Sequence, residues 1–240
     1  MSLKLRRLWI TRGNPSTQVR ILPGLFCDFM SSQREVWNII ADSWTNLRVK
    51  PENEVIDFSK TINSGPILDV GCGNCRNLLP FLERGFYCVG MDFSSGMIRE
   101  TKKFLKRRKL KTNLVIGNLI NLPFKKGTFL SVICVRTLHH ISPIVLRLKS
   151  LEEMKRVGIK ILMSEWKRWQ LRFIWKLIKS FIFGHFGDVY VDWNYHGKKY
   201  KRFHHLYTKK ELEEDLKTVG FKIEKIWYDN KGNVWSLVSV

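Results

Sequence analysis

The sequence predicts a doubly wound α/β fold with a mostly parallel sheet. Ile67–Val70 forms a short apolar run between glycine-containing turns, as a buried central strand does. The chain then turns through Gly71-Cys72-Gly73 into a helix-like segment, Arg76–Leu82. A second short apolar run, Phe86–Met91, follows and ends at Asp92. This strand–turn–helix–strand order is typical of parallel sheets whose ligands bind at the carboxyl ends of the strands.

Seven strands and seven helices are predicted along the chain. After the first two strands, the remaining strands are Leu114–Ile116, Phe129–Val135, Ile159–Ser164, Phe221–Tyr228 and Val234–Val240. The helices are Arg34–Asn46, Pro51–Ile62, Arg76–Leu82, Gly96–Lys109, Ile144–Arg156, Lys167–Phe183 and Lys209–Thr218. Gly184–Arg202 shows no periodicity and is predicted to be irregular. The last two strands, joined by Asp229–Gly232, are expected to form an antiparallel hairpin.

Three helix ends carry recognisable signals. Ser94 and Ser95 are candidate N-caps of the fourth helix. Thr208 followed by Glu211 has the spacing of a capping box, and Gly220 stands where a helix C-terminus favours glycine.

Lys167–Phe183 is amphipathic, with aromatic and basic residues interleaved. We expect it to pack on its own domain or on a partner, and docking on a membrane surface is the alternative.

Charge and cysteine usage limit the class of protein. The chain has 240 residues, a net charge of +21 and a pI near 10.0, which favours a polyanionic partner, either nucleic acid or an anionic membrane surface. A generally basic proteome is the other explanation. Cys72 and Cys75 form a C-x-x-C without the further ligands of a zinc site, so no metal site is predicted. No apolar run has transmembrane length and no secretory signal is evident, so we expect a cytoplasmic protein without membrane insertion.

The chain is predicted to hold one domain behind an N-terminal extension. Residues 1–29 lack periodicity and are expected to be disordered or foreign to the natural product, with Met30 as the true start. The domain, 30–240, divides into lid helices (30–65), a cofactor-binding core (66–166), a substrate-side insertion (167–207) and a C-terminal helix and hairpin (208–240).

The core resembles the class I S-adenosylmethionine-dependent methyltransferases. ILDVGCGN, VGMDFSSGMI and GNLINLPFKKGTF are similar to three sequence blocks of that family, between about Pro66 and Trp166. Arg76 replaces the last glycine of the dinucleotide fingerprint, which favours a nucleoside ligand without a pyrophosphate. A Rossmann-like sheet that binds another ligand is the alternative. The resemblance implies a seven-stranded Rossmann-like methyltransferase sheet with S-adenosylmethionine as cofactor. It also implies a cofactor site made of Asp69, Gly71, Gly73, Asp92, Phe93, Asn118, Leu119 and Val135.

The flanking segments resemble one subfamily, the tRNA methyltransferases that esterify 5-carboxymethyluridine at the wobble position. WTNLRVKP, TLHHIS, VYVDW and RFHHLYTKKELEEDL carry this resemblance. The chain departs from the subfamily at Cys75 for glycine, Asn118 for an acid, Leu130 for Asp and Asp192 for Pro. These departures leave a divergent substrate open.

The expected chemistry requires positioning rather than a base. A carboxylate is ionised at neutral pH and can attack a sulfonium methyl directly. Arginine binds carboxylates with two hydrogen bonds. Arg48, His140 and Arg202 match the subfamily's substrate-side positions and are the catalytic candidates, with Arg136 in second rank.

The family resemblance and the basic residues also indicate partners and alternative functions. The resemblance implies tRNA as substrate and a small zinc-binding activator subunit at the edge of the sheet. The basic stretch TKKFLKRRKLK is either a solvated face or part of an RNA-binding surface. A small-molecule or lipid methyltransferase acting at a membrane is a second hypothesis, and a non-catalytic RNA-binding subunit is a third.

Overall fold

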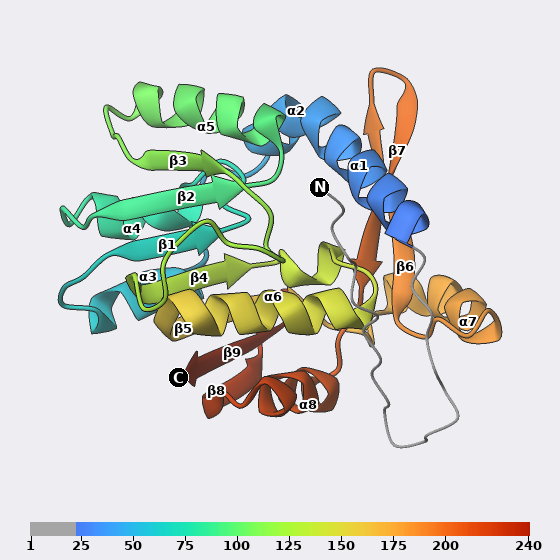
Figure 1. Cartoon of the computed structure of the whole chain (residues 1–240). Coiled ribbons are helices and arrows are strands. Elements are labelled where there is room, and N and C mark those ends of the chain that lie inside the picture. Colours follow the sequence, from blue (N-terminus) through green and yellow to red (C-terminus); the bar gives the residue numbers. More distant parts are fainter. Residues whose placement is uncertain (1–22) are drawn as a thin grey trace, which may run out of the picture.

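One seven-stranded sheet organises the molecule (Figure 1). The computed structural model describes residues 23–240, with side chains from Asp28 onward. The strands lie in the order β3-β2-β1-β4-β5-β9-β8. Their bounds are β1 Ile67–Val70, β2 Cys88–Asp92, β3 Asn113–Ile116, β4 Phe129–Val135, β5 Gly158–Trp166, β8 Lys222–Tyr228 and β9 Asn233–Ser239. Strands β1 to β5 are parallel, and β9 runs antiparallel to β5 and β8. The predicted Rossmann-like sheet with an antiparallel C-terminal hairpin is confirmed.

Helices cover both faces of this sheet and bury two apolar cores. Helices α3 (Asn53–Thr61), α4 (Leu79–Leu82) and α5 (Ser95–Arg107) contribute to one core, and α6 (Ile144–Val157) and α8 (Lys209–Val219) to the other. Strand β4 contributes side chains to both of these cores. Val132 and Cys134 belong to the core under α6, whereas Ile133 and Val135 belong to the opposite one. Alternate residues of a strand point to opposite faces, so a doubly covered strand is apolar throughout.

Local capping signals were predicted correctly. Met97 N–H donates to Ser94 Oγ (3.0 Å) at the start of α5. Glu211 N–H donates to Thr208 Oγ1 (3.1 Å) at the start of α8, and Gly220 ends that helix at φ +77°. Each signal depends on atoms within a few residues, so the sequence alone contains it.

The N-terminal helices differ from the prediction. Helix α1 spans Pro23–Ile39 and α2 spans Ala41–Asn46, so the single helix expected over 34–46 is broken at Ile40. The expectation of no regular structure before Met30 is wrong for residues 23–29, where the Phe29 ring meets Phe203 at 5.4 Å. Residues 1–22 lie outside the described part, and Met30 as the start stays a prediction.

Helix α1 is held on α5 by one side chain. Asn38 Oδ1 accepts hydrogen bonds from Ser94 Oγ (2.8 Å) and Gly96 N–H (2.9 Å). A Cβ at Gly96 would lie 2.6 Å from the Asn38 carbonyl oxygen, so glycine permits this close approach. The N-terminal segment therefore packs over the carboxyl end of the sheet, near β7 (Figure 1).

The segment predicted to be irregular forms a β-hairpin. Strands β6 (Asp188–Tyr195) and β7 (Lys198–His205) pair antiparallel and stand apart from the main sheet (Figure 1). Their two-residue loop, His196-Gly197, has positive φ at both positions, as type I′ hairpin turns require. The prediction was wrong although Val189, Val191, Trp193 and Tyr195 alternate along β6, as the inward residues of a strand do.

The amphipathic segment after β5 is shorter than predicted. A 3₁₀ turn, η3 (Leu171–Phe173), precedes α7 (Ile174–Ile182). Phe173 and Leu177 pack with Val189 and Leu206, so one side of this element is anchored to the hairpin. Helices of the described chain are all too short or too polar to span a bilayer.

Candidate active site

One cavity opens at the carboxyl ends of the parallel strands. It is lined from the turns after β1 to β4, the end of β5, the lid helices α1 and α2, and the inner end of β7. The sequence-predicted residues on its wall are Arg48, Gly71, Gly73, Asp92, Phe93, Asn118, Leu119, Val135, Arg136, His140 and Arg202. The fold therefore brings the predicted cofactor residues and all three catalytic candidates to a single cavity, with Asp69 as the exception.

Asp92 gives this cavity a nucleoside-binding character. Its two carboxylate oxygens accept hydrogen bonds from Gly73 N–H and Ser94 N–H, both at 2.9 Å. Each oxygen retains a second lone pair that ribose hydroxyls can use. Burial raises the Asp92 pKa to about 6, against the backbone donors that lower it. The apolar side chains of Phe93 and Leu119 flank this carboxylate and suit an adenine ring.

The glycines of the first turn keep the backbone close to its neighbours. Gly71 has φ +70°, and a Cβ there would lie 2.2 Å from Thr137 Cγ2. Gly73 has φ +55°, and a Cβ there would meet the Trp44 ring at 2.8 Å. Side chains at these positions would strain the turn and displace the cavity wall. The acid, the glycine turn and the apolar flank together fit S-adenosylmethionine.

Asp69 lies behind the cavity wall instead of on it. The side chain is 1% exposed, and its Oδ2 has no hydrogen-bond partner among the described residues. Burial, offset by Arg76 and reinforced by Asp92, raises its pKa to about 7. Asp69 is thus placed to influence the charge of the turn, without facing a ligand directly.

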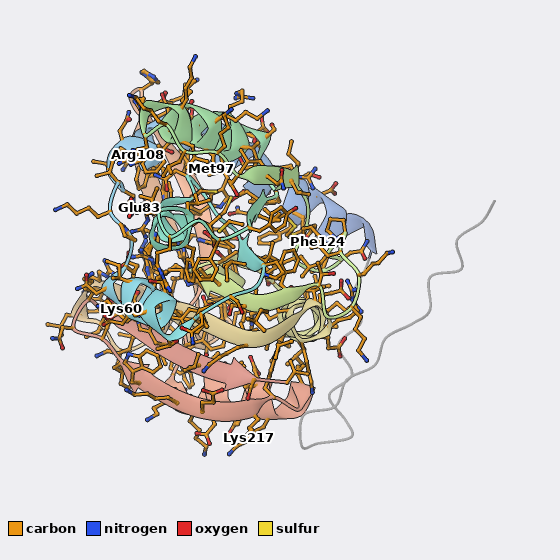
Figure 2. All side chains as sticks on the ribbon, turned by 90° about the vertical axis from the view of Figure 1, so that its left-hand side faces the viewer. Lys60, Glu83, Met97, Arg108, Phe124 and Lys217 are labelled. Atoms are coloured by element: carbon orange, nitrogen blue, oxygen red, sulfur yellow. The ribbon has the colours of Figure 1, made fainter. Side chains whose placement is uncertain are left out.

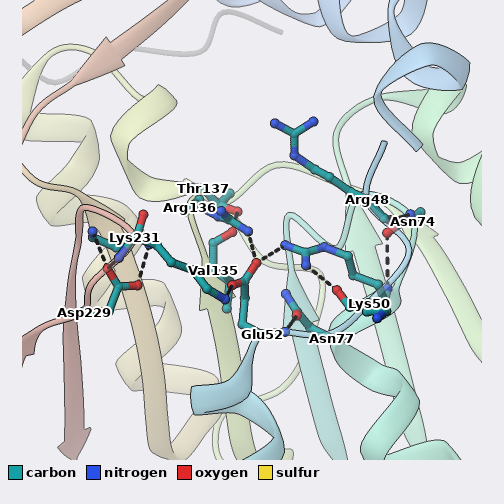
Figure 3. Close-up of polar contacts among 12 residues, drawn as sticks. Arg48, Lys50, Glu52, Asn74, Asn77, Val135, Arg136, Thr137, Asp229 and Lys231 are labelled. Atoms are coloured by element: carbon teal, nitrogen blue, oxygen red, sulfur yellow. Dashed lines mark hydrogen bonds and ion pairs between the residues drawn. The ribbon is translucent and has the colours of Figure 1, made fainter. Parts of the chain in front are cut away.

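Glu52 collects three of the cations near the site (Figure 3). The buried carboxylate is bonded to Arg76 (2.7 Å), Arg136 and Lys231 (3.2 Å). Burial raises the pKa of Glu52, but Arg136 and Arg76 outweigh that effect and lower it to about 2. Arg136, the second-rank candidate, is therefore already paired.

Arg48 and Arg202 have no such partner. Neither guanidinium forms a hydrogen bond or ion pair with a described residue, and Arg202 Nε is buried without an acceptor. Figure 3 shows the Arg48 fork separate from the bonded network around Glu52. Burial lowers the pKa of both groups to about 10, assisted at Arg202 by the charge of Arg48. A buried and a half-buried cation, neither with an ion-pair partner among the described residues, create a binding site for an anion.

Tryptophan rings hold these two guanidiniums in place. Arg48 Cζ lies 5.0 Å from the Trp44 ring centroid and 5.4 Å from that of Trp193. Arg202 Cζ lies 5.5 Å from Trp37 and 4.8 Å from the same Trp193 ring. Stacking on aromatic faces orients a guanidinium while leaving its N–H groups free.

The paired histidines occupy different environments. His139 is 1% exposed and contacts the buried Glu165 carboxyl, with Nδ1 2.9 Å from Oε2. His140 is only partly buried, and its Nδ1–H donates to the Phe203 carbonyl (2.8 Å). Burial lowers the His140 pKa to about 3, so the ring is neutral.

Several wall residues were not predicted from the sequence. They are Gln33, Trp37, Trp44, Trp166 and His204, together with Glu52 and Trp193 beside the cavity. Most of them come from the lid helices and the hairpin. The signal available was compositional: a tryptophan four residues before an arginine in WTNLR, and a further tryptophan in VDW. Which rings and cations meet depends on long-range packing.

Known proteins share the sequence pattern and the fold. A family model described as a methyltransferase domain matches residues 67–158. A candidate methyltransferase of Encephalitozoon cuniculi is 32% identical over 161 residues, 65% of this chain and 70% of that protein. A Schizosaccharomyces pombe protein named tRNA (carboxymethyluridine(34)-5-O)-methyltransferase is 26% identical over 230 residues, 84% of this chain and 92% of its own length.

A solved structure of similar fold is a SAM-dependent methyltransferase from Methanosarcina mazei. Its TM-score is 0.65 at 20% identity, with 79% of this chain and 97% of that chain covered. Fold, glycine turn, acid at the end of β2 and family match agree with one another. The chain belongs to the class I S-adenosylmethionine-dependent methyltransferases, and its cofactor is S-adenosylmethionine.

Proposed function

We propose that this methyltransferase esterifies the carboxylate of 5-carboxymethyluridine at the wobble position of tRNA. The observation that carries the proposal is a pair of guanidiniums without ion-pair partners, half-buried Arg48 and buried Arg202, on the wall of the cofactor cavity. A carboxylate would neutralise both. The name of the Schizosaccharomyces pombe relative supports the same substrate.

The residues suit a carboxylate nucleophile. The bound cofactor supplies a sulfonium methyl group, and an ionised carboxylate needs no deprotonation before it attacks. Arg48 and Arg202 would hold the carboxylate and exclude water from it. The His140 ring, whose Nδ1–H donates to the Phe203 carbonyl, presents its Nε2 lone pair at the same cavity wall.

The defining test is the chemical stability of the transferred methyl group. The protein is incubated with methyl-labelled S-adenosylmethionine and tRNA from cells lacking this gene, and the tRNA is then treated with mild alkali. A methyl ester is cleaved and loses its label, as we expect here. Label that survives alkali would place the methyl group on a base or ribose atom and would contradict the proposal.

Basic side chains on several elements support a nucleic-acid partner. In Figure 2, Lys60 of α3, Arg108 after α5 and Lys217 of α8 lie on the outside of the molecule, and all three are exposed. The helix α5 region is the most strongly basic. We expect tRNA binding to weaken steeply as salt rises, because phosphate contacts release counterions.

A small zinc-binding activator subunit remains part of the proposal. Strand β3 is an edge strand of the described sheet, and its last residue, Ile116, is 60% exposed. An exposed edge strand favours pairing with another chain. If the purified chain alone is monodisperse and fully active on tRNA, this part is wrong.

Helix α7 favours one alternative, a lipid or small-molecule methyltransferase at a membrane surface. Its exposed apolar side chains and those beside it are Trp169, Leu171, Ile174, Trp175, Ile178, Phe181, Ile182 and Phe183. Aromatic and basic residues on one helix suit an anionic lipid interface. Flotation with anionic vesicles, compared with binding to tRNA, separates the two functions. Vesicle binding without tRNA binding would favour the alternative.

A further inference from the structure

Three histidine rings converge on the substrate side of the cavity. His139 and His140 lie in the 3₁₀ turn η2 (Leu138–His140) after β4, and His204 lies in β7. One ring nitrogen from each lies within 4.8 Å of one from each of the others. The ring centroids are 4.4 Å apart for His139–His140, 4.5 Å for His140–His204 and 5.1 Å for His139–His204. We call these three residues the histidine cluster.

Backbone carbonyls determine which nitrogen carries the proton in two of the rings. His140 Nδ1 lies 2.8 Å from the Phe203 carbonyl oxygen, and His204 Nδ1 lies 3.1 Å from that of Arg202. A carbonyl only accepts, so both Nδ1 atoms carry the hydrogen. The Nε2 atoms of these rings therefore present lone pairs, and no described residue donates a hydrogen bond to either one.

His139 has the arrangement of a ligand supported by a carboxylate. Its Nδ1 lies 2.9 Å from Oε2 of Glu165 and accepts a hydrogen bond from Trp166 N–H (3.2 Å), and the His139 and Glu165 side chains are almost completely buried. Metal-binding histidines regularly place their second nitrogen against a carboxylate or a carbonyl. His140 and His204 already have such a contact, and His139 gains one when its hydrogen moves from Nε2 to Nδ1, where Glu165 Oε2 can accept it. Trp166 stacks on His204 with 4.4 Å between centroids, which holds that ring in position.

We propose that the histidine cluster binds one divalent transition-metal ion of the zinc class. Imidazole nitrogen is a favoured ligand of zinc, cobalt and nickel. Three histidines with an open fourth position are typical of catalytic zinc sites, with Zn–N distances of about 2.0–2.1 Å. The ring nitrogens now lie within 4.8 Å of one another and must move closer together for all three to reach that distance from one ion. The fourth position faces the cavity, because all three rings are on its wall.

The nearby arginines determine which fourth ligand strengthens metal binding. Arg202 adjoins the cluster, and Arg172 stacks on Trp166 with 4.9 Å between Cζ and the ring centroid. A dication beside these guanidiniums gains from an anionic fourth ligand, which offsets the repulsion. We therefore expect a carboxylate such as acetate to strengthen metal binding. This inference does not depend on the identity of the methyl acceptor.

The test is a titration of the full chain, purified without a polyhistidine tag, with Co²⁺, followed by displacement with Zn²⁺. Visible absorption should show one low-symmetry Co²⁺ site per chain, lost in His140→Gln and His204→Gln. Glu165→Gln should weaken binding by about 10- to 100-fold, as loss of a supporting carboxylate does. The matched control is His196→Gln, because His196 is exposed in the hairpin loop and should bind metal unchanged.

Two further measurements keep the outcome clear. Thermal unfolding and S-adenosylmethionine binding show whether each variant remains folded. Anomalous diffraction from wild-type crystals soaked with Zn²⁺ requires no variant and should give a peak between the three rings. Absence of a Co²⁺ spectrum, or a Zn²⁺ peak at another position, would overturn the proposal.

Discussion

Arg202 lies against the indole ring of Trp193, with 4.8 Å between Cζ and the ring centroid. Arg48 approaches the same ring at 5.4 Å from a loop far away in sequence. Trp193 is itself fixed by a hydrogen bond from Nε1 to Ser43 Oγ (2.9 Å) in α2. One side chain of the hairpin thus links both substrate-side arginines to the lid.

Replacing Trp193 by Leu should impair substrate binding more than cofactor binding. Each cation–π contact contributes about 0.5–2 kcal/mol, so losing two should lower kcat/KM for tRNA by roughly 5- to 1,000-fold. The affinity for S-adenosylmethionine should stay within about twofold, since Trp193 is not on the cofactor side of the cavity. Steady-state kinetics and calorimetric titration measure the two effects. Trp175→Leu is the matched control, because Trp175 is 78% exposed on α7.

Lysine should not replace arginine at position 48 or 202. A lysine keeps the charge but has neither the planar fork nor the stacking surface of a guanidinium. We expect Arg48→Lys and Arg202→Lys each to lower kcat/KM for tRNA by about 100-fold, or roughly 2.7 kcal/mol. Arg99→Lys, at an exposed position of α5, should behave as wild type. Full activity of both active-site variants would remove these arginines from the proposed site.

Glu52→Gln should destabilise the protein. The substitution leaves Arg76, Arg136 and Lys231 without their shared carboxylate. Breaking a buried ion pair costs about 3–5 kcal/mol, which urea unfolding at neutral pH can detect. Because the Glu52 pKa falls from 4.5 to about 2 on folding, its contribution is present above pH 4.5 and is lost as the pH falls towards 2. Glu83→Gln, at an exposed position, is the control, and equal stability of the two variants would contradict this account.

Cofactor affinity should depend on pH through Asp92. The ionised carboxylate is the form that accepts ribose hydroxyls, and burial raises its pKa to about 6. The dissociation constant of S-adenosylmethionine should therefore be constant above pH 7 and rise roughly tenfold per pH unit below about 6. Asp69→Asn should keep this profile, since Asp69 is behind the wall. An unchanged affinity at pH 5 would show that Asp92 does not bind as its ion.

The sequence by itself determined the elements whose causes are local. The apolar run of β1, the glycine turn, the acid at the end of β2 and the caps Ser94 and Thr208 each depend on neighbouring residues. Because parallel strands end at the same edge of a sheet, these features also located the cofactor cavity.

Only the tertiary structure determined which residues meet on the substrate side of the cavity. Arg48, Trp193 and Arg202 come from a loop and from the two strands of a hairpin, and only packing brings them together. Several cations lie near Glu52. Only the packed structure determines that Arg136 pairs with Glu52 while Arg48 has no ion-pair partner. The histidine cluster likewise requires η2 and β7 to touch. Periodicity and capping act over a few residues, whereas such contacts depend on the burial of the whole domain.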